Sequence, residues 1–361
     1  MIKLNINWAC INKIKNVLNE RILIIKFFLS KIIDWERRKT YMNEKSERIK
    51  AMNFEYPEYI PVRVSLLPAT WKKYREKLEE LVKRHPIIFG EDQTEKRNYD
   101  EVRGTYTKGK HVDAWGCVWE NIAEGMEAIV TEHPLSNRED VNDLEAPEED
   151  IGFPHGFMFL RLTDLRGYEN LMMDFALEPP ELQKLIDIVL EYNMRQVENL
   201  LEEKPDRQIL SFGDDLGMQN SLPMNPEKWR EYLKPCYSKI YGACKEAGYN
   251  VYMHTDGHIL EIIPDLIDCG VDIINPQVRA NGLDNLREVA KGKVCIDLDL
   301  DRQLIPFASP EEIEDHVRES VEKLGSPEGG LCLIAECAPD VPLENIEAIC
   351  NALEKYRSYY K

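Results

Sequence analysis

The chain has 361 residues and a formal net charge of −19, with 43% apolar and 31% charged residues. This composition is typical of a soluble globular protein, and the strong negative charge argues against non-specific binding to nucleic acid or to an anionic membrane. The nine cysteines are scattered, with no CxxC pair. The sequence therefore predicts a reducing, cytoplasmic location without a disulfide framework.

The first forty residues differ from the rest because they carry nine Lys and Arg against three Asp and Glu. Their apolar run at residues 22–33 contains two lysines, so it is too short and too charged to predict a membrane span. Three interpretations remain open: a basic amphipathic surface helix, a signal anchor, or an upstream start codon with translation beginning at Met42. We assign no function to residues 1–41 and expect a single catalytic domain at residues 42–361.

From residue 59 onward, short apolar runs alternate with helical patterns, after a charged and irregular insertion at 89–150 is set aside. A capping box at Ser309, with Pro at the first helical position, predicts one helix start. At least seven strands joined by helices, with no GxGxxG turn, favour the α/β class and a closed (β/α)8 TIM barrel over a Rossmann sheet. The predicted strands are residues 59–67, 157–162, 208–212, 250–254, 271–275, 294–298 and 331–335.

Polar residues gather just after the predicted strands, where an α/β barrel has its mouth and its active site. Arg161 and Asp164 join this group if residues 157–162 form a strand. Such a concentration of acids, with one histidine and one cysteine, is unusual for a purely structural barrel. The other members are Asp214, Asp215, His254, Asp256, Asn275, Gln277, Asp299, Asp301, Glu336 and Cys337.

A metal site is one interpretation of three of these residues. His254 and Asp256 are two positions apart, so they project from the same face of a strand, and Cys337 could approach across the mouth. Nitrogen, oxygen and thiolate donors suit zinc, and three protein ligands leave one position open for substrate. The alternatives are a hydrogen-bonded structural histidine and an inert buried thiol.

The remaining candidates also have two interpretations each. Asp214 and Asp215 precede a glycine-containing loop and either cap that loop or act on substrate. Trp115 lies in the insertion and belongs either to the core or to a lid that accepts an aromatic substrate.

A family resemblance is carried by residues 253–277, MHTDGHILEIIPDLIDCGVDIINPQ, which resemble the "HxCGD…LIExGVDxLNPxQ" core of the uroporphyrinogen decarboxylase superfamily. The segments that begin at Ser309 and Pro342 resemble two late helix starts of that family. The resemblance extends from about residue 42 to the end of the chain. It implies a (β/α)8 barrel.

Two departures separate this chain from the true decarboxylases. Residues 60–71, IPVRVSLLPATW, lack the arginine-rich "PVWxMRQAGR" segment, and residues 335–339, AECAP, replace the "NLGHG" turn. The chain therefore resembles the other branch, the corrinoid-dependent methyltransferases, whose zinc is held by a His-x-Cys pair and a distant Cys. Carried over by position, the ligands are His254, Asp256 in place of the near Cys, and Cys337, with Glu336 as a substitute ligand.

The resemblance implies a zinc-dependent methyltransferase that moves a methyl group from a small-molecule donor, we expect a methoxylated aromatic, to the cobalamin of a separate corrinoid carrier protein. The runner-up is a metal-free decarboxylase of a tetrapyrrole or other small acid, and the third possibility is a non-catalytic corrinoid- or tetrapyrrole-binding barrel. The expected catalytic residues are Asp215 and Glu336. The expected substrate-binding residues are Arg161, Asp214, Asn275, Gln277 and Trp115.

Overall fold

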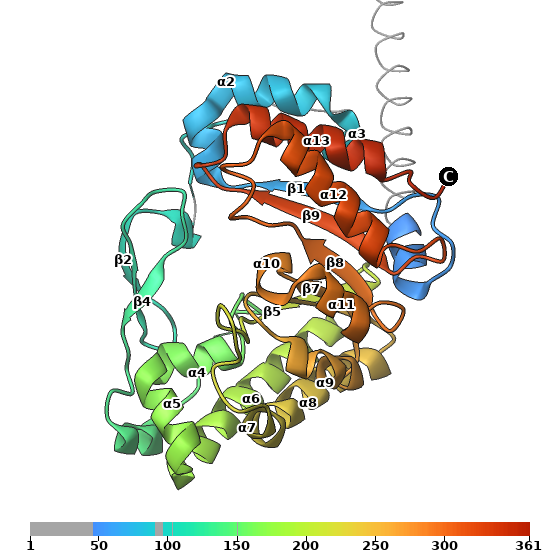
Figure 1. The fold of residues 1–361 in the computed structure, drawn as a ribbon. Coiled ribbons are helices and arrows are strands. Elements are labelled where there is room, and N and C mark those ends of the chain that lie inside the picture. The colour runs from blue at the N-terminus through green and yellow to red at the C-terminus, as the bar shows by residue number, and fades with distance from the viewer. Residues whose placement is uncertain (1–45, 91–96, 103, 150) are drawn as a thin grey trace, which may run out of the picture. The chain divides into compact units, whose positions relative to one another are not determined.

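The computed structural model describes residues 46–90, 97–102, 104–149 and 151–361 (Figure 1). The basic extension expected at residues 1–41 lies outside this range. Among the described helices, none is both long and apolar enough to cross a membrane. The elements that follow all belong to residues 47–361.

Six parallel strands form the main sheet, in the order β1-β9-β8-β7-β6-β5. Strands that are neighbours in this sheet follow one another in the chain, except that the first strand, β1, pairs with the last, β9. This order is expected when a helix follows each strand and returns the chain to the same end of the sheet. All six coincide with runs that the sequence predicts as strands. They are β1 (Val62–Leu66), β5 (Ile209–Gly213), β6 (Asn250–Thr255), β7 (Val271–Pro276), β8 (Cys295–Asp299) and β9 (Leu331–Cys337).

Amphipathic helices cover the outer face of this sheet (Figure 1). Helix α13 (Leu343–Tyr356) packs on β1 and β9. Two further helices, α2 (Pro68–Arg84) and α12 (Pro310–Leu324), pack against α13. The predicted capping box of α12 is confirmed, since the Ser309 side chain accepts from the Glu312 amide and Glu312 accepts from the Ser309 amide. The other helices are α3 (Pro86–Phe89), α5 (Tyr168–Leu177), α6 (Pro180–Glu202), α7 (Pro226–Tyr232), α8 (Lys234–Glu246), α9 (Ile263–Asp268), α10 (Val278–Asn281) and α11 (Leu283–Val289), with 3-10 turns η1 (Gly104–Tyr106), η2 (Arg138–Asp143) and η3 (Leu260–Ile262).

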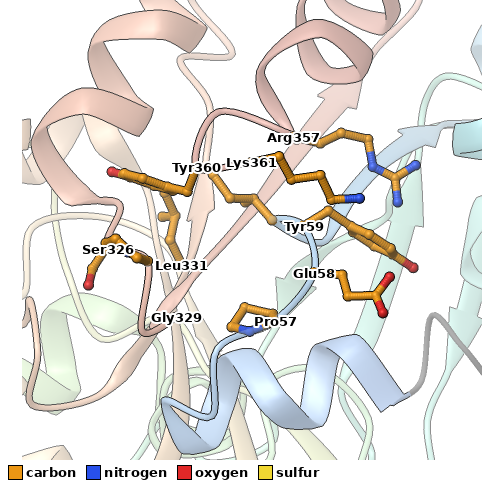
Figure 2. Close-up of a pocket in the computed structure, with 11 residues that line it drawn as sticks. Pro57, Glu58, Tyr59, Ser326, Gly329, Leu331, Arg357, Tyr360 and Lys361 are labelled. Atoms are coloured by element: carbon orange, nitrogen blue, oxygen red, sulfur yellow. The ribbon is translucent and has the colours of Figure 1, made fainter.

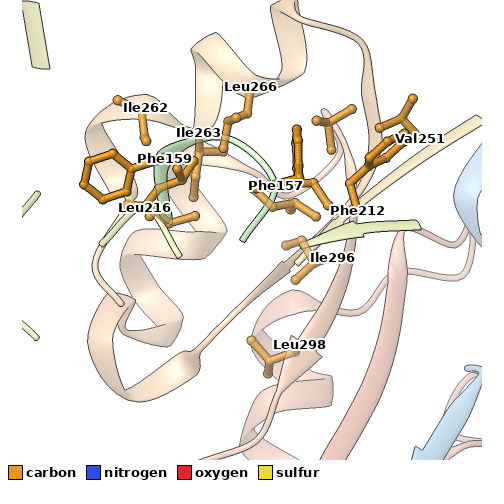
Figure 3. Close-up of a cluster of buried hydrophobic side chains, with 14 of the residues drawn as sticks. Phe157, Phe159, Phe212, Leu216, Val251, Ile262, Ile263, Leu266, Ile296 and Leu298 are labelled. Atoms are coloured by element: carbon orange, nitrogen blue, oxygen red, sulfur yellow. The ribbon is translucent and has the colours of Figure 1, made fainter. Parts of the chain in front are cut away.

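Alternate residues of each strand face opposite sides of the sheet. The outward residues, such as Phe212, Val251 and Ile296, join the large buried cluster beneath the helices (Figure 3). The inward residues Tyr252 and Cys295 belong to a separate buried cluster with the helical residues 47–53. The inner face of the sheet is therefore filled by this cluster at the amino-terminal ends of the strands. The inward residues at the carboxyl-terminal ends of the strands do not belong to this cluster.

The insertion expected to be irregular contains ordered structure. Strands β2 (Gly109–Val112), β3 (Val118–Asn121) and β4 (Ile129–Glu132) pair antiparallel in a small sheet of their own. Asp113 fixes the turn between β2 and β3, because its carboxylate accepts hydrogen bonds from the amides of Trp115 and Cys117.

The predicted strand at residues 157–162 is wrong, because this segment enters helix α4 (Phe159–Arg166). The amides of Met158, Phe159 and Leu160 donate to the carboxylate of Asp214, at 3.1, 2.6 and 2.9 Å. Asp214 therefore satisfies the free amides at the helix start from a distant part of the sequence. A short apolar run does not by itself distinguish a buried strand from a buried helix.

The fold is of the α/β class and belongs to the (β/α)8 barrel type, as the sequence predicts. Its curled parallel sheet has six strands in the described residues, where the sequence predicts at least seven. The carboxyl ends of β5, β6, β8 and β9 lie at one end of this sheet.

Candidate metal centre at the carboxyl end of the barrel

Two histidines and an aspartate converge at the carboxyl end of the sheet. One ligand atom from each of His155, Asp215 and His254 lies within 4.8 Å of the other two. Nε2 of His155 is 3.2 Å from Oδ1 of Asp215, and the two imidazole rings are 5.4 Å apart between centroids. These three residues, hereafter the His–Asp–His cluster, come from the segment before α4 and from the ends of β5 and β6.

A glycine at position 213 leaves room for the ring of His155. A Cβ atom added to Gly213, the last residue of β5, would lie 2.5 Å from Nδ1 of His155. The amide of Gly156 also donates to the Gly213 carbonyl at 2.8 Å, which fixes the backbone beside the ring. His155 was not among the predicted site residues, because a strand at residues 157–162 would place His155 at the far end of the barrel.

Asp215 is held by contact between the loops that follow β5 and β6. Its Oδ1 accepts from the Asp256 amide at 3.0 Å. Gly217 and Gly257 bring the two backbones so close that a Cβ on Gly257 would overlap the Gly217 carbonyl group. Glycine at 257, where φ is +84°, meets both the conformational and the steric demand of this contact.

His254 is oriented by Asn275 on the neighbouring strand β7. Its Nδ1 lies 2.6 Å from Asn275 Oδ1, while the Asn275 amide group donates to the Asp297 carbonyl. Because the amide group is used in this way, Asn275 presents its oxygen to the ring and Nδ1 is the protonated nitrogen. The lone pair of a neutral His254 is then on Nε2, which lies 3.3 Å from Asp256 Oδ1.

One arginine, Arg302, lies beside three further carboxylates of the mouth. Arg302 lies 2.7 Å from Asp299 and 3.0 Å from Glu336, and its Nη2 is 3.8 Å from Asp256 Oδ1. Burial raises the pKa of Asp299 to about 6, although Arg302 opposes the shift. Asp256 therefore lies between the cluster histidine and the arginine.

The local charges favour protonated histidines in the absence of a cation. Burial alone would lower the pKa of His155, but the hydrogen bond and charge of Asp215, with the charges of Asp214 and Asp256, raise it to about 9. The pKa of His254 is raised in the same way against the effect of burial, with Asp256 as the main partner. For Asp215, burial is outweighed by the His155 hydrogen bond and charge, so its pKa is lowered.

These features fit a divalent cation. Two nitrogen donors and one carboxylate oxygen are an accepted ligand set for zinc, and they leave a position open. A dication would take the place of two imidazole protons in a region rich in carboxylates. Oδ1 of Asp256 is buried without a hydrogen-bond donor, which is a further sign that the region suits positive charge.

The structure does not bring Cys337 to the cluster. Cys337 is fully buried in the outer apolar cluster beneath the helices, which also contains Cys350 of α13. Burial raises its pKa to about 12, so it remains a thiol. Its neighbour Glu336 has the opposite orientation and faces Arg302.

Three residues expected to bind substrate have structural partners instead. Arg161 lies on α4, is buried, and forms an ion pair with Asp113 at 2.7 Å. Trp115 is buried against Tyr192 of α6, with ring centroids 4.9 Å apart. Asp214 is fully buried, where it caps α4 and accepts from the Tyr237 hydroxyl at 2.7 Å.

The other two lie near the cluster. Asn275 orients His254, and Gln277 accepts from the amide of Gly257 at 2.9 Å through Oε1. Both therefore help to set the backbone and side-chain geometry of the β6 end.

Features elsewhere in the barrel do not contribute to this site. A cavity of about 350 Å³ lies before β1 and β9, at the opposite end of these strands (Figure 2). Among its lining residues, Arg357 stacks on the ring of Tyr59, with 3.8 Å between its guanidinium carbon and the ring centroid.

Together, these observations define a parallel α/β barrel protein with a candidate metal site at the carboxyl end of its strands. A sequence model described as "Uroporphyrinogen decarboxylase (URO-D)" matches residues 159–356. This match covers more than half of the chain, and the chain belongs to the uroporphyrinogen decarboxylase family. No curated protein matches the chain.

Among solved structures, the fold is similar to that of a methyltransferase from Methanosarcina mazei. The TM-score is 0.60 at 19% sequence identity, and the similarity covers 87% of this chain and 98% of the other. A dihydropteroate synthase from Xanthomonas albilineans reaches a TM-score of 0.28 at 13% identity, over 41% of this chain and 57% of the other. That second score is too low to indicate a shared fold.

Proposed function

We propose that this protein is a zinc-dependent methyltransferase that moves a methyl group from a methoxylated substrate to the corrinoid of a carrier protein. The observation that supports it most is the His–Asp–His cluster at the barrel mouth. The resemblance of residues 253–277 to the corrinoid-dependent branch, and the fold shared with a methyltransferase, agree with this proposal.

His155, Asp215 and His254 would hold the zinc, with Asn275 keeping Nε2 of His254 available. This set replaces the expected set of His254, Asp256 and Cys337. When bound, zinc would act as a Lewis acid that stabilises negative charge on the departing oxygen. Asp215 would then serve as a metal ligand, whereas the sequence analysis expects it to be a catalytic residue.

In the proposed reaction the bond between the methyl carbon and the ether oxygen breaks. The oxygen keeps the bonding electron pair and takes one proton, and the reduced cobalt of the carrier supplies the pair that forms the new bond to the methyl group. Asp256 and Glu336 are partly exposed carboxylates beside the cluster, so either can hold that proton at an oxygen atom. Arg302 positions Glu336 through their 3.0 Å contact.

The runner-up, a metal-free decarboxylase, would need cations to bind the carboxylates of its substrate. In the described segments that directly follow the barrel strands, the arginines are Arg279, on α10, and Arg302. Both already contact carboxylates, Arg279 through Asp301 at 2.7 Å and Arg302 through Asp299 and Glu336. In a metal-free site, protonated His155 and His254 would be further cations, and they also contact carboxylates, Asp215 and Asp256. This pairing of the cationic side chains favours the methyltransferase.

The test is the metal content of the purified full chain, measured by plasma mass spectrometry on the wild type, His155→Ala, His254→Ala and the control His111→Ala. His111 is exposed on the small sheet, where it stacks on Trp119. We expect about one zinc per chain in the wild type and the control, and none in the two cluster variants. A wild type without metal would support the decarboxylase, and iron in place of zinc would overturn the metal assignment while keeping its ligands.

A further inference from the structure

The partly exposed charges around the His–Asp–His cluster are mostly negative. The side chains of Asp215, Asp256 and Glu336 are 29%, 34% and 27% exposed, so all three reach solvent at the mouth. Asp299 adds a fourth carboxylate directly behind Arg302. The ends of β5, β6, β8 and β9 thus place four carboxylates at the mouth that holds the cluster.

Among the described residues, the arginines and lysines in the segments that directly follow the barrel strands already have partners. Arg302 contacts three of the four carboxylates, and Arg279 pairs with Asp301. The lysines at the start of α2 also have acceptors, since Lys72 pairs with Glu124 and Lys73 donates to the Pro339 carbonyl. Within the described residues, a substrate carboxylate would therefore have to displace one of these contacts to bind a side-chain cation.

The balance of charge remains negative even with zinc in place. Four carboxylates, one guanidinium and a divalent ion leave one negative charge in excess when both histidines are neutral, as ligands must be. Because the groups are only partly exposed, this charge is less screened than at an open surface. It would attract a cation and repel an anion.

We infer that the methyl donor carries a positive charge, such as a protonated amino group, and bears no carboxylate. This inference rests on the proposed function. It does not use Arg161, which was expected to bind substrate, because Arg161 is buried and paired with Asp113. It also narrows the donor from methoxylated aromatics in general to those with an ammonium group.

The test uses the zinc-loaded full chain and three methoxylated aromatics of similar size: 4-methoxybenzylamine, which is a cation at neutral pH, uncharged 4-methoxybenzyl alcohol, and the anion 4-methoxybenzoate. Binding is measured by calorimetry at low salt. We expect the amine to bind about tenfold or more tightly than the alcohol, and the benzoate to bind most weakly. Equal or tighter binding of the benzoate, or no binding of the amine, would overturn the inference.

A matched pair of variants assigns the effect to the mouth. Glu336→Gln removes one of the carboxylates and releases a contact of Arg302, so the preference for the amine should fall and that for the benzoate should rise. Asp340→Asn removes the same charge from an exposed loop residue after β9, and its binding order should match the wild type. Relative affinities for the three compounds that are unchanged in Glu336→Gln would contradict a role for the mouth carboxylates.

Methyl transfer to cob(I)alamin, followed by absorbance, separates this inference from the proposed function. Binding in the expected order without transfer from any compound would count against the methyltransferase and leave the charge preference standing. Transfer that is fastest from the benzoate would support the methyltransferase and overturn the charge preference.

Discussion

Nδ1 of His254 lies 2.6 Å from Oδ1 of Asn275, across the pair of strands β6 and β7. The amide group of Asn275 is used by the Asp297 carbonyl, so the asparagine has one orientation and the histidine one tautomer. A contact between two strands of the barrel wall thereby decides which nitrogen faces the His–Asp–His cluster.

Asn275→Ala should weaken zinc binding by about 10- to 100-fold, the usual effect of removing a partner that orients a metal-ligating histidine. The cause is loss of the preferred tautomer and ring position, with the three ligands still present. Competition with a chromophoric chelator would measure the affinity. The control Asn285→Ala removes an asparagine of α11 that donates to the Asn281 carbonyl, and it should bind zinc as the wild type does. Equal affinity in the two variants would contradict the role of Asn275.

Gly213→Ala should displace His155, because the added methyl group would lie 2.5 Å from its Nδ1. We expect zinc binding to be lost or weakened at least about tenfold while the barrel still folds, since the clash falls on a partly exposed side chain. The control Gly242→Ala places the same methyl group in helix α8 with no atom within 4 Å. It should keep zinc and gain about 0.5–1 kcal/mol in the free energy of unfolding. Full zinc content in Gly213→Ala would show that His155 is not a ligand.

The six strands of the sheet could be predicted because each is a short apolar run bounded by polar loops. The structure places Asp215, His254, Asn275 and Glu336 at or next to the ends of these strands. The start of α4 could not be predicted from the sequence. Its amides are capped by Asp214, whose position depends on the finished fold. That single misassignment also removed His155 from consideration.

The sequence could not decide which side chain faces the mouth, that of Cys337 or that of Glu336, for a different reason. Neighbouring residues of a strand face opposite sides, so an error of one position exchanges the barrel interior for the helix layer. The family resemblance favoured the cysteine by residue type, whereas the strand geometry places the glutamate toward the mouth.

Cys337→Ala tests this difference directly. Because the thiol is buried among apolar residues away from the cluster, the variant should keep its zinc and lose only about 1 kcal/mol in the free energy of unfolding from the small cavity left behind. Metal analysis and denaturant unfolding would measure the two effects. Loss of zinc in a folded Cys337→Ala protein would restore the cysteine as a ligand and contradict the orientation of β9.

Asp164 on α4 should make the stability of the protein depend on pH near neutrality. Its side chain is 16% exposed, and its closest cation is Arg161 at 3.9 Å, which already pairs with Asp113. Burial is the main cause that raises its pKa to about 7, with the charges of Asp113 and Asp214 acting in the same direction against Arg161 and His155. An unfolded aspartate has a pKa of about 3.9.

Because the folded pKa is the higher one, folding takes up a proton between these values, and the stability that Asp164 contributes is complete below about pH 4 and is lost as the pH rises to about 7. An asparagine side chain cannot titrate, so Asp164→Asn should unfold with the same free energy as the wild type near pH 4. Above pH 7 the variant should be about 2–4 kcal/mol more stable. Urea unfolding from pH 4 to 8 would measure the difference, with Asp206→Asn as the control at an exposed loop residue. A difference that stays flat across this range, as expected for the control, would contradict the raised pKa of Asp164.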